Sequence, residues 1–121
     1  MLKIENNFIY LTRGDTAYIT IELENEDYFE QGDVVTFSLK RKLSNEQYEL
    51  QKEINIENHL NATVIKLDPQ DTANKNTGSY FYDIQLTRTS GDVYTIVTPD
   101  EDEPKPNFKL LMEVTKWVTR T

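Results

Sequence analysis

The sequence predicts an all-β fold, namely an antiparallel β-sandwich of eight or nine short strands with one short helical crossover. Three observations support this fold class. Apolar and polar residues alternate with a period of two in most segments, glycine-containing turns separate those segments, and a single segment has helical character. The chain has 121 residues, the usual length of one domain, and we expect residues 1–121 to form it.

The strands are predicted from side chains that alternate between an apolar and a polar face. Successive side chains of a strand point to opposite sides of the sheet, so each apolar set is expected to face the core. These sets are Ala17, Ile19, Ile21 and Leu23; Val35, Phe37 and Leu39; Leu50, Ile54 and Ile56; Ile65 and Leu67; Tyr80, Tyr82, Ile84 and Leu86; and Phe108, Leu110, Met112 and Val114. Residues 8–11 and 92–98 complete the predicted strands.

Turn-forming residues lie between these segments. Glycine flanked by polar residues occurs at positions 13–15, 31–33 and 90–92, where it permits the tight connections of a chain of antiparallel strands. The connection after Leu67 is different. Asp68 suits a helix N-cap and Pro69 suits the first helical position, so one or two helical turns are expected before Gly78 returns the chain to a strand.

Residues 76–82 predict a tyrosine corner. In immunoglobulin-like sandwiches such a tyrosine opens a strand, and its hydroxyl bonds back to the backbone of the preceding connection. Tyr80 is the expected corner residue, with Gly78 and Pro69 as its structural support. Tyr82 then occupies the position of the second immunoglobulin cysteine, and Phe37 is expected to pack against it. The predicted sandwich is therefore immunoglobulin-like.

Two motifs resemble a known family. The sequence TRGDT at residues 12–16 and the sequence GSYFYDI at residues 78–84 are similar, in order and spacing, to motifs of the N-terminal immunoglobulin-like domain of phage baseplate upper proteins and related short prophage tail proteins. This resemblance implies a non-enzymatic structural protein of a phage or prophage tail that acts through contacts with tail or baseplate proteins or with itself. It also implies a protein located in the virion and made in the bacterial cytoplasm.

Composition excludes several classes of function. The chain has 13 Lys and Arg against 21 Asp and Glu, a formal net charge of −8, which disfavours nucleic acid and anionic membrane surfaces as partners. It has no cysteine and one histidine, so thiol catalysis and Cys- or His-rich metal sites are excluded. No signal peptide or membrane-spanning run is evident.

Two features near the C-terminus are candidate contact surfaces. Trp117 falls on the same predicted strand face as Leu111, opposite the apolar set of that strand, so it is either an interface anchor or part of the core. Residues 98–107 are expected to form a mobile, proline-containing acidic loop. Its acids are Asp100, Glu101, Asp102 and Glu103, and they are either simply solvated or a patch that selects a basic neighbour. We expect no metal or other cofactor there, because the run lacks the spacing of a calcium loop.

Tyr18 and Tyr94 are further candidate residues for protein contacts, and they also support an alternative function. Each lies opposite the main apolar set of its strand, and aromatic rings on a flat sheet can stack on sugars. The alternative is therefore a carbohydrate-binding module that recognises glycans of the host cell wall. Catalysis is not expected, because His59 has no nucleophile or carboxylate at a recognisable spacing. The Arg-Gly-Asp tripeptide at residues 13–15 is interpreted as a turn.

Overall fold

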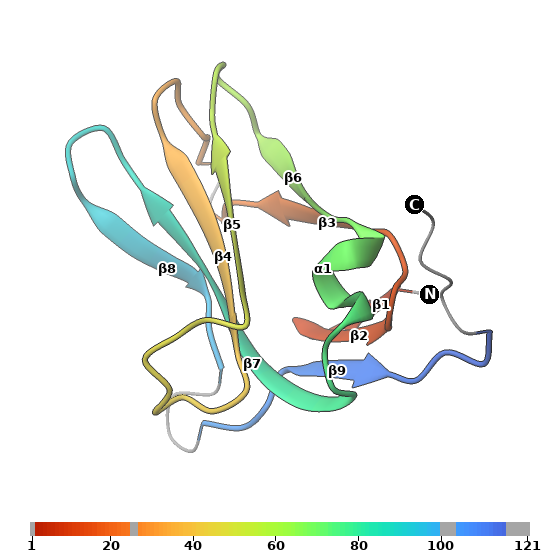
Figure 1. Cartoon of the computed structure of the whole chain (residues 1–121). Helices are drawn as coiled ribbons and strands as arrows, with labels where there is room; N and C mark the ends of the chain where they lie inside the picture. The colour runs from red at the N-terminus through yellow and green to blue at the C-terminus, as the bar shows by residue number, and fades with distance from the viewer. Residues whose placement is uncertain (1, 25–26, 100–103, 116–121) are drawn as a thin grey trace.

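The structure, a computed structural model of the chain, describes residues 2–24, 27–99 and 104–115. Within those residues the chain forms nine strands and one short helix, arranged as a sandwich (Figure 1). In chain order the elements are β1 Leu2–Glu5, β2 Phe8–Thr12, β3 Ala17–Glu22, β4 Val34–Lys40, β5 Leu50–Asn55, β6 Ala62–Leu67, α1 Pro69–Ala73, β7 Gly78–Thr87, β8 Val93–Val97 and β9 Phe108–Leu111. The predicted all-β sandwich with one short helix is confirmed.

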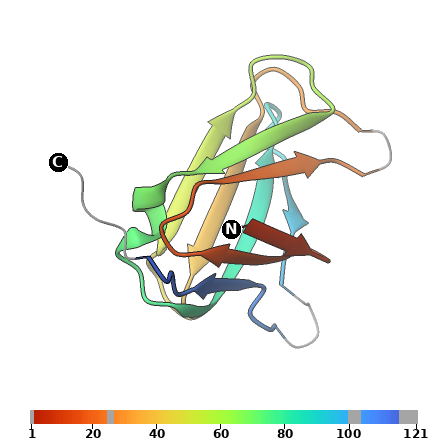
Figure 2. The ribbon, with the colours of Figure 1, turned by 90° about the vertical axis from the view of Figure 1, so that its right-hand side faces the viewer.

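The sandwich consists of one large and one small sheet. The large sheet has the strand order β1-β2-β9-β7-β4-β5, and β8 also pairs with β7. The small sheet contains β3 and β6, which cross in front of the large sheet in Figure 2. All pairs are antiparallel, as predicted, except β2 and β9, which run parallel with Ile9 opposite Phe108. Periodicity predicts which face of a strand is apolar, but it carries no information on strand direction.

The apolar ladders predicted from the sequence form the core between the sheets. Alternate residues along β3, β4 and β7 are buried, and the residues between them are more exposed. The buried apolar and aromatic side chains are Ile9, Leu11, Ala17, Ile19, Ile21, Phe29, Val35, Phe37, Leu39, Ile56, Ile65, Leu67, Tyr80, Tyr82, Ile84, Leu86, Phe108 and Leu110. This burial is the main favourable contribution to folding.

Tyr80 forms the corner that its sequence context predicts. Its fully buried side chain donates a hydrogen bond from the hydroxyl to the carbonyl of Asn76, four residues upstream. The guanidinium of Arg41 lies 4.7 Å from the centre of the Tyr80 ring. Gly78 has a φ of +127°, a backbone conformation that favours glycine.

Tyr82 is the second aromatic anchor of β7. Its ring stacks on Phe37 at 5.5 Å between centroids, the packing that the sequence predicts for this pair. Its hydroxyl donates to the carbonyl of Asn7 at 2.5 Å, which ties β7 to the turn between β1 and β2. Burial raises the pKa of the Tyr82 hydroxyl to about 12.

The helix α1 begins as the sequence predicts. Asp68 has an extended backbone, Pro69 is the first helical residue, and the Asp68 N–H donates to the carboxylate of Asp71 at 2.7 Å. The hydroxyl oxygen of buried Thr72 accepts a hydrogen bond from the Gly14 N–H at 2.8 Å. The helix therefore fixes the turn that contains residues 13–15.

Strands β8 and β9 occupy one edge of β7 in succession. Ile84 of β7 pairs with Val97 of β8, and Tyr80 of β7 pairs with Phe108 of β9. Between these pairs, the side-chain amide of Asn107 accepts from the Tyr82 N–H at 2.8 Å and donates to the Tyr82 carbonyl at 2.9 Å. The Asn107 side chain thus replaces the backbone hydrogen bonds that an uninterrupted strand would form.

The last strand is shorter than predicted. β9 ends at Leu111, and the side chains of Met112 and Val114 are 63% and 101% exposed, so their predicted place in the core is wrong. The physical reason is that both neighbouring strands end there. Leu110 pairs with Gly78, the first residue of β7, and Leu111 pairs with the last residue of β2, so no described strand remains to pair beyond it.

Replacing Tyr80 by Phe tests the corner. We expect Tyr80→Phe to lower the free energy of unfolding by about 1 kcal/mol or more, because the buried Asn76 carbonyl loses its donor. Urea denaturation measures this change. Tyr94→Phe, which alters an exposed tyrosine, is the matched control. An unchanged unfolding midpoint for Tyr80→Phe would show that the corner bond does not stabilise the fold.

Replacing Asn107 by Asp tests the interruption of the edge strand. A carboxylate still accepts from the Tyr82 N–H but cannot donate to the Tyr82 carbonyl, so we expect a loss of about 1–3 kcal/mol in the free energy of unfolding. Asn58→Asp, at an exposed position in the connection before β6, is the control for the added charge. Equal effects of the two substitutions in chemical denaturation would contradict the proposed role of the amide.

Candidate functional site

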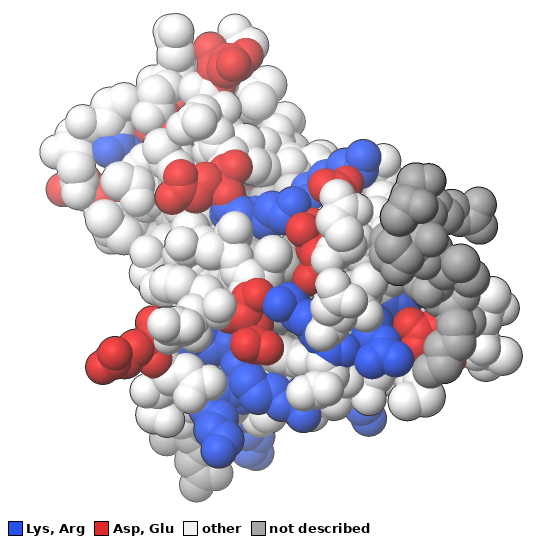
Figure 3. Space-filling model, viewed as in Figure 1, with Lys and Arg blue, Asp and Glu red and all other residues white. Residues whose placement is uncertain are grey.

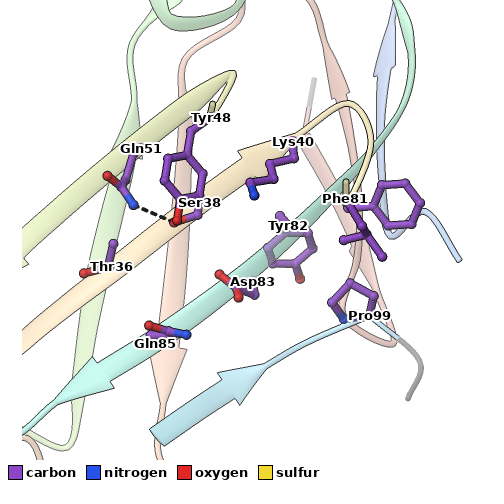
Figure 4. A pocket seen from close by; sticks show the side chains of 11 residues that line it. Thr36, Ser38, Lys40, Tyr48, Gln51, Phe81, Tyr82, Asp83, Gln85 and Pro99 are labelled. Carbon is purple, nitrogen blue, oxygen red and sulfur yellow. Dashed lines mark hydrogen bonds between the residues drawn. The ribbon is translucent and has the colours of Figure 1, made fainter. Parts of the chain in front are cut away.

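The outer face of the large sheet carries a groove over β4, β5 and β7. Because side chains alternate along a strand, the residues between the core positions of β4 and β7 point away from the core. Ser38 of β4 pairs with Gln51 of β5 on one side and with Asp83 of β7 on the other. These three residues therefore form one polar row across the floor of the groove (Figure 4).

Aromatic and apolar side chains form the two sides of the groove. Tyr48, from the connection between β4 and β5, lies on one side, and Phe81 of β7 lies on the other with Pro99 (Figure 4). The recess has a volume of about 180 Å³. The Tyr48 side chain is 50% exposed, although it is large and aromatic. The site is therefore a recess with a polar floor between aromatic sides.

The polar floor offers donors and acceptors that the protein does not fully use. The Gln51 side-chain amide donates to the Ser38 hydroxyl oxygen at 3.0 Å, which leaves the Ser38 hydrogen and the Gln51 carbonyl oxygen for other partners. Within the described part of the chain, the Asp83 carboxylate accepts no hydrogen bond. Burial raises the pKa of Asp83, and the charge of Lys40 opposes that shift.

Lys40 lies at the end of the groove that carries Tyr48. Its ammonium donates to the carbonyl of Asn45 at 2.6 Å and lies 4.9 Å from the centre of the Tyr48 ring. These two contacts connect the end of β4 to the loop that carries Tyr48, and a cation over an aromatic ring is a favourable contact. Lys40 of β4 therefore holds the Tyr48 side chain in place at the groove.

The structure does not bring Tyr18 and Tyr94 together. Tyr18 lies on the outer face of the small sheet, 60% exposed, where it pairs with Lys66. Tyr94 belongs to the large sheet and pairs with Leu86, a core residue, so it points toward the inner side at the open edge of that sheet. It lines a second recess, of about 460 Å³, together with Leu23. The single aromatic platform predicted from the sequence is therefore not formed by these two residues.

The remaining candidate contact residues are only partly described. Leu111 lies half-buried at the end of β9, opposite Thr12 of β2. Trp117 and the acidic residues Asp100–Glu103 lie outside the described residues. The acidic run follows Pro99 directly in the sequence, and Pro99 lines the groove.

The tripeptide at residues 13–15 is part of a junction between distant segments. The Arg13 guanidinium donates to both oxygens of Glu113, at 2.8 and 3.1 Å, and to the carbonyl of Lys75 at 3.0 Å. Gly14 has a φ of +83°, as a tight turn requires. These contacts give Arg13 a structural role, in agreement with the interpretation of this sequence as a turn.

His59 lies in the connection before β6 and is exposed. Its ring stacks on Tyr28 at 4.4 Å, and its Nδ1 lies 2.5 Å from a carboxylate oxygen of Glu30. None of these residues lines the groove. In the described ranges, no group of three Asp, Glu, His or Cys side chains is close enough to hold a metal ion.

Basic and acidic side chains alternate across the face that carries α1 (Figure 3). Lys52 lies 2.7 Å from Asp71, and Lys66 lies 3.5 Å from Asp68. These ion pairs join β5 and β6 to the start of the helix. Lys52 and Lys66 are thus partnered by neighbouring acids.

Comparisons with known proteins add no further information on function. No protein-family model, no curated protein and no solved structure matches the chain. Among the described residues, no helix has both the length and the apolar character needed to cross a bilayer.

The groove was not predicted from the sequence, although one signal for it is present. Phe81 lies between two core tyrosines of β7 and has an apolar side chain at a position whose face should be polar. One apolar residue on an outer face indicates that this part of the surface differs from its surroundings. It does not indicate which other residues lie beside it. Ser38, Gln51 and Asp83 come together only through strand register, which single-strand patterns do not specify.

Replacing Asp83 by Asn tests the electrostatics of the groove floor. Burial raises the pKa of Asp83 above the ordinary 3.8. The folded protein therefore loses stability as the pH rises through this raised pKa, because the charged carboxylate is costly to bury. Asp83→Asn should therefore raise the melting temperature at neutral pH by a few degrees.

The gain should disappear at a pH below about 3, where the carboxyl is protonated in the folded and the unfolded state. Thermal melts of both proteins across this range measure the difference. Glu53→Gln, at an exposed position of β5, is the control for removing a negative charge. An equal gain at both ends of the pH range would contradict the assigned burial effect.

Proposed function

We propose that the chain is a non-enzymatic structural protein of a phage or prophage tail, associated with the baseplate, that acts through protein–protein contacts. It belongs to the virion and is made in the bacterial cytoplasm. The two motifs that resemble the baseplate family support this proposal. The turn at residues 12–16 contacts α1 through the bond from Gly14 to Thr72, and α1 leads directly into the tyrosine corner of β7. The motifs are therefore parts of one structural unit.

The observation that carries the proposal is the open small sheet. β3 and β6 pair only with each other in the described chain, so each strand has one edge without a strand neighbour. The outer face of this sheet exposes Tyr18 and Val64, at 60% and 44%. An unpaired edge beside exposed apolar side chains is a suitable place for a neighbouring chain to bind.

Affinity capture tests this proposal. The tagged protein is used as bait in lysate of its source cells after prophage induction, and the bound proteins are identified by mass spectrometry. We expect recovery of tail or baseplate proteins. Tyr18→Ala with Val64→Lys should reduce that recovery by about tenfold or more, since central apolar contacts dominate such interfaces.

Val93→Lys is the matched control, because Val93, on β8 of the other sheet, is 54% exposed, between Val64 and Tyr18. Circular dichroism establishes that each variant is folded. Recovery of no tail protein by the wild type would overturn the proposed function. Recovery that is lost with Val93→Lys but kept with the double variant would move the contact surface to the large sheet.

A further inference from the structure

We propose that the groove over β4, β5 and β7 binds one ring of a neutral saccharide. This inference goes beyond the proposed assembly function and does not depend on it. It rests on the chemistry of the groove floor, the placement of the aromatic side chains and the pairing of β4 and β7 along both of their edges.

The floor matches the hydroxyl groups of a sugar. Each sugar hydroxyl can donate one hydrogen bond and accept others. Asp83 offers a carboxylate that accepts no hydrogen bond from the described chain, and Gln51 offers a carbonyl oxygen two strands away, on the far side of β4. Ser38, which lies between them, supplies a donor. Two adjacent hydroxyls can therefore bind along this row, and a hydrogen bond to a carboxylate is stronger than one between neutral groups.

The sides of the groove match the apolar face of a sugar ring. Tyr48 and Phe81 both lie on the Lys40 side of the polar row, Tyr48 toward β5 and Phe81 on β7 (Figure 4). The carbon-bound hydrogens of a pyranose form an apolar face that packs on aromatic rings, which are rigid and lose little entropy on binding. The combination of a few polar groups with aromatic walls is typical of small-molecule sites.

The charges favour a neutral ligand over an anionic one. The Asp83 carboxylate faces the groove and repels a phosphate or a second carboxylate. Lys40, the lysine that lines the groove, already donates to the Asn45 carbonyl and contacts the Tyr48 ring. A neutral hexose or N-acetylhexosamine is not repelled by Asp83 and needs no cation from Lys40.

The backbone argues against a peptide strand as the occupant. β4 pairs with β5 along one edge and with β7 along the other, so its main-chain groups are already bonded. Peptides that bind by strand addition need an unpaired edge. In the described chain the outer edge of β5 is unpaired, but it lies beyond Gln51 and not over the floor of the groove. The cavity, about 180 Å³, is also smaller than the ~300–1,000 Å³ typical of drug-sized ligands. One ring fits inside, and further units of a glycan would extend over the sheet.

Nuclear magnetic resonance titration tests the proposal. The ¹⁵N-labelled full chain is titrated with the methyl glycosides of glucose, galactose, mannose, N-acetylglucosamine and N-acetylgalactosamine. We expect at least one glycoside to shift the amide signals of Ser38, Gln51 and Asp83 in a saturable manner. Asp83→Ala and Tyr48→Ala should each weaken that binding by about tenfold, the effect of losing one good contact.

Tyr18→Ala and Tyr94→Ala are the matched controls, since both remove an exposed tyrosine outside the groove. They should leave the affinity unchanged. The spectra themselves report whether each variant is folded, and Gln51→Ala replaces any variant that is not. Three results would each overturn the proposal: no response to any glycoside, a response centred on Tyr18 or Tyr94, or groove signals that respond to a purified tail protein but to no sugar.

Discussion

The arrangement of this protein depends on one strand that is hydrogen-bonded along both edges. β7 pairs with β4 on one side and with β8 and then β9 on the other. Its alternation assigns Tyr80 and Tyr82 to the core and Phe81 and Asp83 to the outer face. The same ten-residue segment therefore anchors the sandwich and supplies one side of the groove. A shift of its register by one residue would reverse both roles.

The interruption of the edge strand links the fold to the groove. Residues 98–107 separate β8 from β9, and the Asn107 side chain fills the resulting gap in the hydrogen bonding of β7. Pro99, at the start of this interruption, lines the groove. There Pro99 lies beside Phe81 (Figure 4). Interruptions and bulges at sheet edges commonly redirect side chains in this way.

Local features were predictable from the sequence, and non-local ones were not. The ladder of β7, the hydrogen bond of Tyr80 and the start of α1 follow from periodicity and from capping chemistry. The hairpin of β1 and β2 was not anticipated, although Asn6 and Asn7, both at positive φ, are a sequence signal for its turn. The parallel pairing of β9, its early end and the polar row of the groove depend on which strands become neighbours. That choice is made by packing between distant segments, and a period of two is compatible with many arrangements.

Hydrogen exchange of the backbone amides tests most directly whether β7 holds the structure together. Amides exchange slowly where opening requires most of the fold to open, and a strand bonded on both edges satisfies that condition. We predict that the slowest-exchanging amides lie in β7 and β4, and that those of the two-stranded sheet β3–β6 exchange faster. Slowest exchange in β3 and β6, with β7 opening early, would contradict the account.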